Sequence, residues 1–176
     1  ARYGWKSTVK RWILWGLSLV GGGVQAWAIA SPLSGDTSWW LQLAAMTTLY
    51  LLSERCRSAT ASASVTWLFA CAWITGSIWW LFISMNVYGG LPAIVASLAV
   101  FGLSGFLASF YALAGAILHV LRPSAALMRA GSFGALWLAA ELTRATVLTG
   151  FPWVAISYAH VDGPLASLAP WVGVYG

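Results

Sequence analysis

Five long apolar runs, separated by short segments that hold most of the charge, constrain the fold of this chain more than any other feature. Residues 12–31, 37–53, 61–84, 92–121 and 127–149 form these runs. A helix needs about 20 apolar residues to cross roughly 30 Å of hydrocarbon. Backbone polar groups in lipid must be hydrogen-bonded within the chain, and strand-like alternation is absent, so the runs predict helices. We expect an all-α, polytopic transmembrane helix bundle with five complete spans and a sixth span that begins near residue 165.

The composition excludes an ordinary soluble domain. The 176 residues are 60% hydrophobic and only 7% charged, whereas soluble domains carry about 25% charged residues. The net charge of +5 does not indicate a nucleic-acid partner. A nucleic-acid protein gathers its basic residues on one water-facing surface, and here they lie in short clusters between apolar runs.

These basic clusters predict the orientation in the membrane. Four of the nine Lys and Arg residues precede the first run, and two lie between runs two and three. One lies between runs four and five, and Arg129 lies just inside the fifth run. Arg144, near the end of the fifth run, is the exception. Basic residues concentrate on the cytoplasmic side of membrane proteins. We therefore expect a cytoplasmic N-terminus in a bacterial inner membrane, with loops 32–36, 85–92 and 150–164 facing the periplasm.

Glu141 and Arg144 are the sharpest local feature, because charge inside a span costs about 2.5–3.5 kcal/mol and marks a functional site by default. Residues three apart share a helix face, and Trp137 lies on that face too. Two interpretations carry equal weight. The pair forms a polar platform that holds a phospholipid headgroup or braces a loop, or it is a neutral pair that braces the bundle, with Arg144 reaching outward past Thr149.

The segment after the fifth run predicts an ordered outer loop. Gly150 and Pro152 end the helix, which places Phe151 and Trp153 at headgroup level, and on the residues alone plain interfacial anchoring is the favoured explanation for the two rings. Asp162 and Pro164 frame a turn. A nucleophilic triad of Ser157, His160 and Asp162 is disfavoured because the spacing is tight and no nucleophile elbow frames the serine.

Three smaller features complete the pattern. Tyr88, Gly89, Gly90 and Pro92 form another outward turn, for which a helix-breaking hairpin is sufficient explanation. Small residues recur every four positions from Ser104 and from Gly131, a spacing that permits close helix packing.

Cys56 lies between two arginines that could lower its pKa, although a plain interfacial cysteine is favoured. Neither a metal nor a cofactor is expected, since the two histidines, His119 and His160, lie at opposite membrane faces.

In its order of motifs the chain resembles the membrane domain of apolipoprotein N-acyltransferases. The tail is the specific part: Glu141-Leu142-Thr143-Arg144, Leu148-Thr149-Gly150-Phe151-Pro152-Trp153, Tyr158-Ala159-His160 and Asp162-Gly163-Pro164-Leu165. Weaker likenesses are Ala30-Ser31-Pro32, Gly76-Ser77-Ile78-Trp79-Trp80, Tyr88-Gly89-Gly90-Leu91-Pro92 and Gly173-Val174-Tyr175-Gly176. The likeness is continuous from about residue 67.

The resemblance implies a function. Such proteins move an acyl chain from a phospholipid to the N-terminal amine of a diacylglyceryl-cysteine lipoprotein, with a Glu-Lys-Cys set in a nitrilase-like domain. No position of this chain matches that set, so no catalytic residue is expected here, and the nitrilase-like domain is expected beyond residue 176. This segment would admit and position the phospholipid acyl donor and the lipoprotein acceptor. The alternative is an inactive, shortened relative that acts as a scaffold subunit of a larger membrane complex.

From the residues and the resemblance together we expect two groups of site residues. The substrate-binding residues would be Glu141, Arg144, Phe151, Trp153, Tyr158, His160, Trp79 and Tyr88. The structural motif residues would be Gly89, Gly90, Pro92, Gly150, Pro152, Asp162 and Pro164.

Overall fold

The computed structural model describes residues 11–175, and every regular element within that range is a helix. This confirms the all-α class. The longer helices are α1 (Arg11–Ile29), α2 (Trp39–Glu54), α3 (Ala59–Ser77), α5 (Ala93–Leu121) and α6 (Ala126–Thr146). The short elements are α4 (Trp80–Ile83), η1 (Ser84–Tyr88), η2 (Val147–Thr149), η3 (Ile156–His160), η4 (Ala166–Leu168), α7 (Ala169–Val172) and η5 (Gly173–Tyr175).

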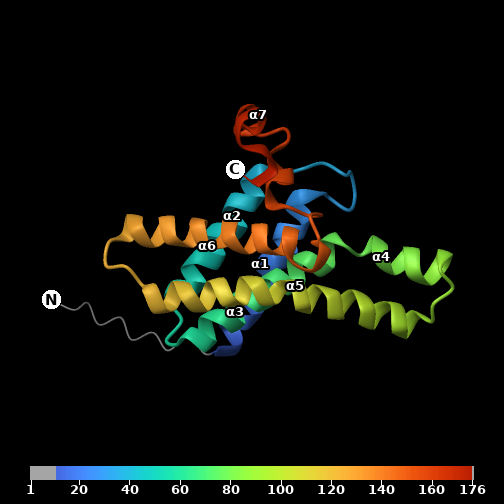
Figure 1. Ribbon diagram of the computed structural model, residues 1–176, viewed down its shortest axis with the longest axis horizontal. Coiled ribbons are helices and arrows are strands. Elements are labelled where there is room, and N and C mark those ends of the chain that lie inside the picture. Colours follow the sequence, from blue (N-terminus) through green and yellow to red (C-terminus); the bar gives the residue numbers. More distant parts are fainter. Residues whose placement is uncertain (1–10, 176) are drawn as a thin grey trace.

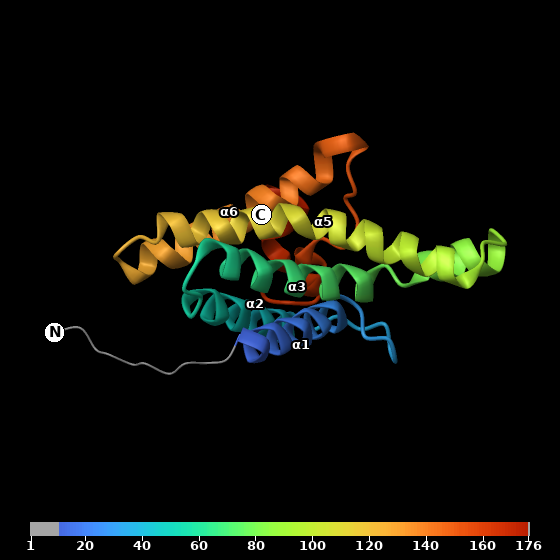
Figure 2. The same cartoon turned by 90° about the horizontal axis from the view of Figure 1, so that it is seen from below.

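The five long helices pack in the spatial order α2, α1, α3, α5, α6. Figure 2 shows α1 and α2 together at the lower edge, α3 above them, and α5 and α6 at the upper edge. The core lies mainly between α2, α3, α5 and α6, and includes Phe69, Trp73, Ala108, Tyr111 and Trp137. The third helix is therefore the centre of the bundle.

Two opposite ends of the bundle can be distinguished. The α2–α3 and α5–α6 connections meet at one end, which we call the basic end, where Arg129 Nε lies 3.0 Å from Glu54 Oε2. Arg122 also donates a hydrogen bond to the backbone oxygen of Glu54 there, at 3.2 Å. The α1–α2 loop and the turn before α5 lie at the opposite end, which we call the far end (Figure 1).

Only part of the predicted set of spans is confirmed. In the described part of the chain, α1 and α5 are long and apolar enough to cross a membrane. Helix α3 qualifies as a third only together with α4 and η1, from which it is bent by 52°. Helix α2 has 16 residues, and α6 carries three charged side chains. Five complete spans are therefore not confirmed.

Two boundaries differ from expectation. The run 61–84 is not one straight helix, because the α3 helix ends at Ser77 and the chain turns at Ile78, whose side chain is buried. Trp79 and Trp80 are exposed beyond that turn. The sixth predicted span begins, within the described residues, as a series of short helical turns over 166–175 rather than one long helix.

Close helix packing occurs between α3 and α5. A Cβ added at Gly115 would lie 2.3 Å from Thr66 Oγ1, and Ser62 Oγ donates to the Gly115 carbonyl at 2.8 Å. Of the four small residues spaced from Ser104, Ser104 and Ala108 are buried, while Ala112 and Ala116 are half-buried. The small-residue stripe of α6 from Gly131 is not its packed face, because the buried residues there are Trp137, Ala140, Glu141 and Arg144. A large aromatic ring and a charged pair fill that contact instead.

Candidate functional site

The charged pair of α6 is formed and buried. Arg144 Nη2 lies 3.2 Å from Glu141 Oε2, and the two residues are 0% and 3% exposed. A buried charge is tolerated only when it is paired and hydrogen-bonded. Arg144 therefore does not reach outward past Thr149. The pair is formed inside the bundle, and it also braces the loop after α6.

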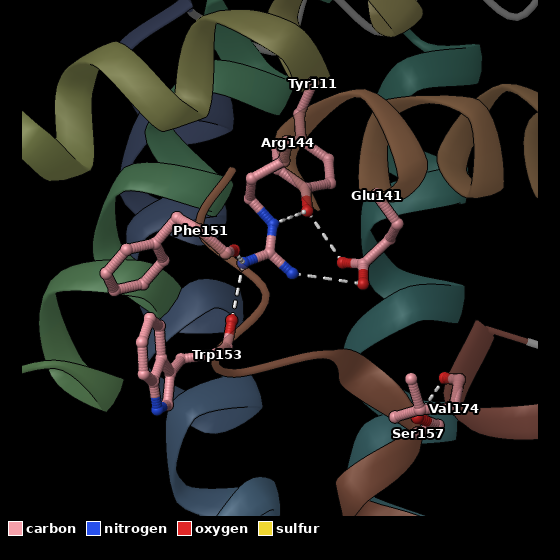
Figure 3. A network of polar contacts seen from close by, with 7 residues as sticks. All are labelled: Tyr111, Glu141, Arg144, Phe151, Trp153, Ser157 and Val174. Carbon is pink, nitrogen blue, oxygen red and sulfur yellow. Dashed lines mark hydrogen bonds and ion pairs between the residues drawn. The ribbon is translucent and has the colours of Figure 1, made fainter. Parts of the chain in front are cut away.

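A tyrosine that the sequence did not single out completes this network. Tyr111 of α5 donates its hydroxyl proton to Glu141 Oε1 at 2.7 Å and accepts a hydrogen bond from Arg144 Nε at 2.9 Å. Figure 3 shows its hydroxyl between the guanidinium and the carboxylate. The only signal available was a phenol inside an apolar run, because a buried tyrosine hydroxyl usually finds a partner.

Aromatic rings cover one side of the network and help to bury it. The Tyr111 and Trp137 ring centroids are 4.7 Å apart, and Trp73 packs against both rings. The Arg144 guanidinium carbon lies 5.9 Å from the centroid of the Trp73 ring, within cation–π range. In such low-dielectric surroundings each hydrogen bond is stronger and each missing partner is more costly.

The remaining donors of Arg144 hold the loop that follows α6. Arg144 Nη1 donates to the Phe151 carbonyl at 2.7 Å and also to the Trp153 carbonyl. In return, the Phe151 amide donates to the Arg144 carbonyl at 2.9 Å. As Figure 3 shows, the guanidinium thus joins the carboxylate, the phenol and two loop carbonyls.

Gly150 makes this return of the chain possible. Its φ is +77°, a conformation that side chains strongly disfavour. A Cβ at this position would lie only 1.9 Å from the Ala145 carbonyl oxygen. Pro152 follows between the two residues whose carbonyls Arg144 binds, and its fixed φ limits the freedom of the turn.

The braced loop displays two aromatic rings. The Phe151 and Trp153 rings lie together, with centroids 5.2 Å apart and an interplanar angle of 51°. Phe151 is half-buried against the core, while Trp153 is 55% exposed. Figure 3 shows both rings turned to the side of the loop away from the charged pair. Tyr158, further along, is also exposed.

The rest of the loop, residues 156–164, rests on the start of α2. Thr37 Oγ1 donates to Asp162 Oδ2 at 3.5 Å, and Gly163 lies so close to the Trp39 ring that an added Cβ would be 3.0 Å from it. Pro164 follows directly after this contact. The predicted turn at Asp162 is therefore a docking point between two chain segments.

Ser157 and His160 take no part in a triad within the described residues. Ser157 Oγ donates to the Val174 carbonyl (Figure 3). His160 is half-buried, and its Nδ1 has no hydrogen-bond partner among residues 11–175. Burial lowers the pKa of His160, because a charged imidazolium loses solvation there.

Trp79 and Tyr88 are both exposed. Trp79 directly precedes α4, and Tyr88 ends η1 in the hairpin with α5 that forms the outer part of the far end (Figure 1). The turn itself is ordered by hydrogen bonds from Gly89 N to Ser84 O and from Leu91 N to Met85 O, at 2.9 and 3.0 Å. Gly90 has a φ of +68°, and Pro92 precedes the first residue of α5.

A cavity of about 290 Å³ lies between α6, α2 and the segments around η3 and η5. Glu141 of the charged pair forms part of its wall. Its other lining side chains are mainly apolar, among them Met46, Phe133, Trp137 and Ile156.

Comparison with known families gives one match that covers most of the chain. Residues 22–176 match the family model of the apolipoprotein N-acyltransferase N-terminal domain.

Individual relatives agree with this match. A protein of Verminephrobacter eiseniae named apolipoprotein N-acyltransferase is 49% identical over 166 residues, which are 90% of this chain and 30% of the relative. Proteins of the same name from Ralstonia nicotianae and Bordetella bronchiseptica are 45% and 38% identical, over 78% and 91% of this chain and 27% and 30% of their own lengths. The chain thus spans less than a third of these relatives.

Proposed function

Because this chain belongs to the apolipoprotein N-acyltransferase family, we propose that it admits and positions lipid substrates for an acyl transfer carried out elsewhere in the protein. The donor would be a phospholipid, and the acceptor the N-terminal amine of a diacylglyceryl-cysteine lipoprotein. A thiolate nucleophile needs a base and an oxyanion stabiliser. The family resemblance assigns these groups to a nitrilase-like domain, so this segment would contribute substrate delivery.

The observation that supports this proposal best is the fixed geometry of the loop after α6. Two carbonyls of the loop bind a guanidinium that is itself held by a carboxylate and a phenol. A binding surface built on locked side chains loses less entropy when a ligand binds. Trp153 and Tyr158 would then contact lipid headgroups or acyl chains directly, while Glu141 and Arg144 would act through the position of the loop.

The hairpin of α4, η1 and the first part of α5 would form one wall of a lateral opening. Helix α4 and η1 contain no buried residue, and the hairpin projects beyond the other helices (Figure 1). Its exposed side chains are almost all apolar, including Trp79, Trp80, Val87, Ile94 and Leu98. An arm of this kind faces lipid, and loop 150–164 would form the opposite wall.

In this proposal the protein lies in the bacterial inner membrane with five spans. The short α2 and the charged α6 would cross with the others, since the burial of Glu141 and Arg144 removes their cost of exposure to lipid. The far end would face the periplasm by the positive-inside rule.

Substitution of Trp153 in the full-length protein tests the proposal. Trp153→Ala is expected to lower the rate of acyl transfer to a lipoprotein acceptor at unchanged protein level, chiefly through a raised KM for lipid substrate. The matched control is Trp40→Ala, which removes an equally exposed ring, 57% against 55%, at the start of α2. If Trp153→Ala and Trp40→Ala both keep wild-type kinetics, Trp153 does not belong to the site.

The scaffold alternative predicts a different product of the natural gene. A natural chain that lacks a Glu-Lys-Cys catalytic domain would favour a scaffold subunit over an enzyme. The intact mass of the natural product distinguishes the two.

A further inference from the structure

A second, larger groove lies between α1, α3 and α5, away from the braced loop. It is an open, shallow hollow with a volume of about 560 Å³. The lining residues are Arg11, Trp15, Ala63, Ser64, Trp67, Leu68 and Ala112. The groove lies toward the basic end, because Arg11 and Ala63 are near the starts of α1 and α3.

One cation stands at the end of this otherwise apolar groove. The Arg11 guanidinium carbon lies 4.5 Å from the centroid of the Trp15 ring. Stacking on a ring face leaves the edge of a guanidinium free to bind a planar or tetrahedral anion with two hydrogen bonds. The opposite wall is also fixed, since Trp67 Nε1 donates to the Gly105 carbonyl at 3.0 Å.

Arg11 has no carboxylate to neutralise it within the described part of the chain. The chain has only four acidic residues, and residues 11–175 include all of them. Glu54 and Glu141 pair with Arg129 and Arg144. Asp162 accepts from Thr37 near the far end, and Asp36 lies in the α1–α2 loop at that same end.

We propose that this groove binds one anionic phospholipid of the leaflet at the basic end, with its phosphate on Arg11 and one acyl chain along Trp15, Trp67 and Ala112. Charge complementarity selects an anionic lipid, because its net negative headgroup supplies the neutralisation that the chain itself does not, whereas the cation of a zwitterionic headgroup already offsets its own phosphate. The apolar remainder of the groove suits an acyl chain and would not suit a soluble anion. This lipid would bind at the basic end, whereas the proposed substrate loop lies at the far end. Binding of the lipid therefore does not depend on acyl transfer.

The test uses the delipidated full-length protein in detergent, with its melting temperature measured in added phosphatidylglycerol and in phosphatidylcholine of the same acyl chains. Phosphatidylglycerol is expected to raise the melting temperature more than phosphatidylcholine, since a ligand that binds the native state stabilises it. Loss of one charged hydrogen-bonding group should weaken binding about tenfold. Arg11→Gln should therefore lose most of the difference, and Ala112→Leu, which fills the groove without a change of charge, should lose it too.

Two matched controls separate a groove from general attraction. Arg57→Gln removes one positive charge from an exposed position at the same end, and Ala99→Leu enlarges an exposed side chain on the same helix; both should keep the difference. Native mass spectrometry should find one retained phosphatidylglycerol in the wild type and none in Arg11→Gln. An equal loss in Arg57→Gln, an unaffected Ala112→Leu, or a wild type that does not distinguish the two lipids would each overturn the proposal.

Discussion

At the scale of single residues, Arg144 makes more hydrogen bonds in the candidate site than any other side chain there. It donates to Tyr111, Glu141, Phe151 and Trp153 and faces the Trp73 ring. A planar guanidinium with five donors can serve several partners in different directions at once, and an ammonium group cannot. The position therefore requires arginine for its shape as well as for its charge.

Removal of this one side chain should be strongly destabilising. Arg144→Met leaves Glu141 buried without its counter-ion, a change that costs about 3–5 kcal/mol. The double variant Glu141→Gln/Arg144→Met should cost less than the sum of the single variants, because no uncompensated charge remains. Thermal unfolding of the full-length protein in detergent measures both. Additive losses would show that the two side chains contribute independently.

The sequence predicted this site only in part, for reasons of distance along the chain. Glu141 and Arg144 are three residues apart, so helical geometry alone placed them on one face beside Trp137. Tyr111 is 30 residues from Glu141, and no local pattern links two such positions. Likewise, the spacing could not show that the carbonyls of Phe151 and Trp153 are the targets of Arg144, because that depends on the fold of the intervening turn.

Cys56 should be inert, in agreement with the interfacial interpretation rather than the reactive one. It is buried, its Sγ donates to the Leu52 carbonyl at 3.4 Å, and burial raises its pKa to about 11 despite the nearby Arg122. A raised thiol pKa means that stability from this group is present below pH 9 and lost as the pH rises toward 11.

Alkylation measures this directly. In a Cys71→Ser background, native protein at pH 8 should react with iodoacetamide at Cys56 far more slowly than the control Arg57→Cys in a Cys56→Ser background, and the rate should rise only toward pH 11. Equal rates at pH 8 would contradict the burial of this thiol.

At the scale of helices, contacts between small residues determine how α3 and α5 approach. Gly115 lies against Ser62 and Thr66 with no room for a methyl group, and a hydrogen bond from Ser62 crosses the interface there. Interhelical hydrogen bonds and close backbone contact stabilise helix pairs in membranes, where no hydrophobic driving force acts between helices.

A pair of identical substitutions on α5 tests this contact. Gly115→Ala should lower the melting temperature of the full-length protein, because the new methyl group would force the helices apart. Gly102→Ala, for which no atom lies within 4 Å of the added Cβ, should be neutral or slightly stabilising, since alanine favours helix by up to about 1 kcal/mol. An equal change of melting temperature in the two variants would contradict a close contact between α3 and α5 at Gly115.

Helices are the elements that sequence predicts best, and their breaks are what it predicts least well. Helix α5 begins at Ala93, directly after the helix-breaking Pro92, and ends at Leu121, directly before the charged Arg122. Both boundaries can be read from the sequence. The bend after Ser77 follows a Gly76-Ser77 pair, at which helices commonly kink, but the run 61–84 stays apolar on both sides of it. Packing of the buried Ile78 determines where the chain leaves the bundle, and that contact is tertiary.

At the scale of the whole molecule, charge divides the two ends of the bundle. Arg122 and Arg129 meet Glu54 at the basic end, while the turn at Tyr88 lies at the far end. The positive-inside rule then predicts opposite accessibility for the two ends in a cell.

Labelling in intact spheroplasts checks this orientation. In a background without Cys56 and Cys71, a cysteine at Tyr88, which is 85% exposed, should react with a membrane-impermeant maleimide. A cysteine at the exposed Arg57 should react only after permeabilisation. Labelling of Arg57→Cys in sealed spheroplasts would reverse the proposed topology.

The link between Arg144 and its loop also has a consequence for biosynthesis. The carbonyls that complete the guanidinium's hydrogen bonds belong to residues seven and nine positions later, so the ribosome delivers them after the charge itself. The guanidinium therefore has its full set of hydrogen-bond acceptors only once the chain has been extended through Trp153, and a chain that stopped before Phe151 would hold this buried group with only Glu141 and Tyr111 as hydrogen-bond partners.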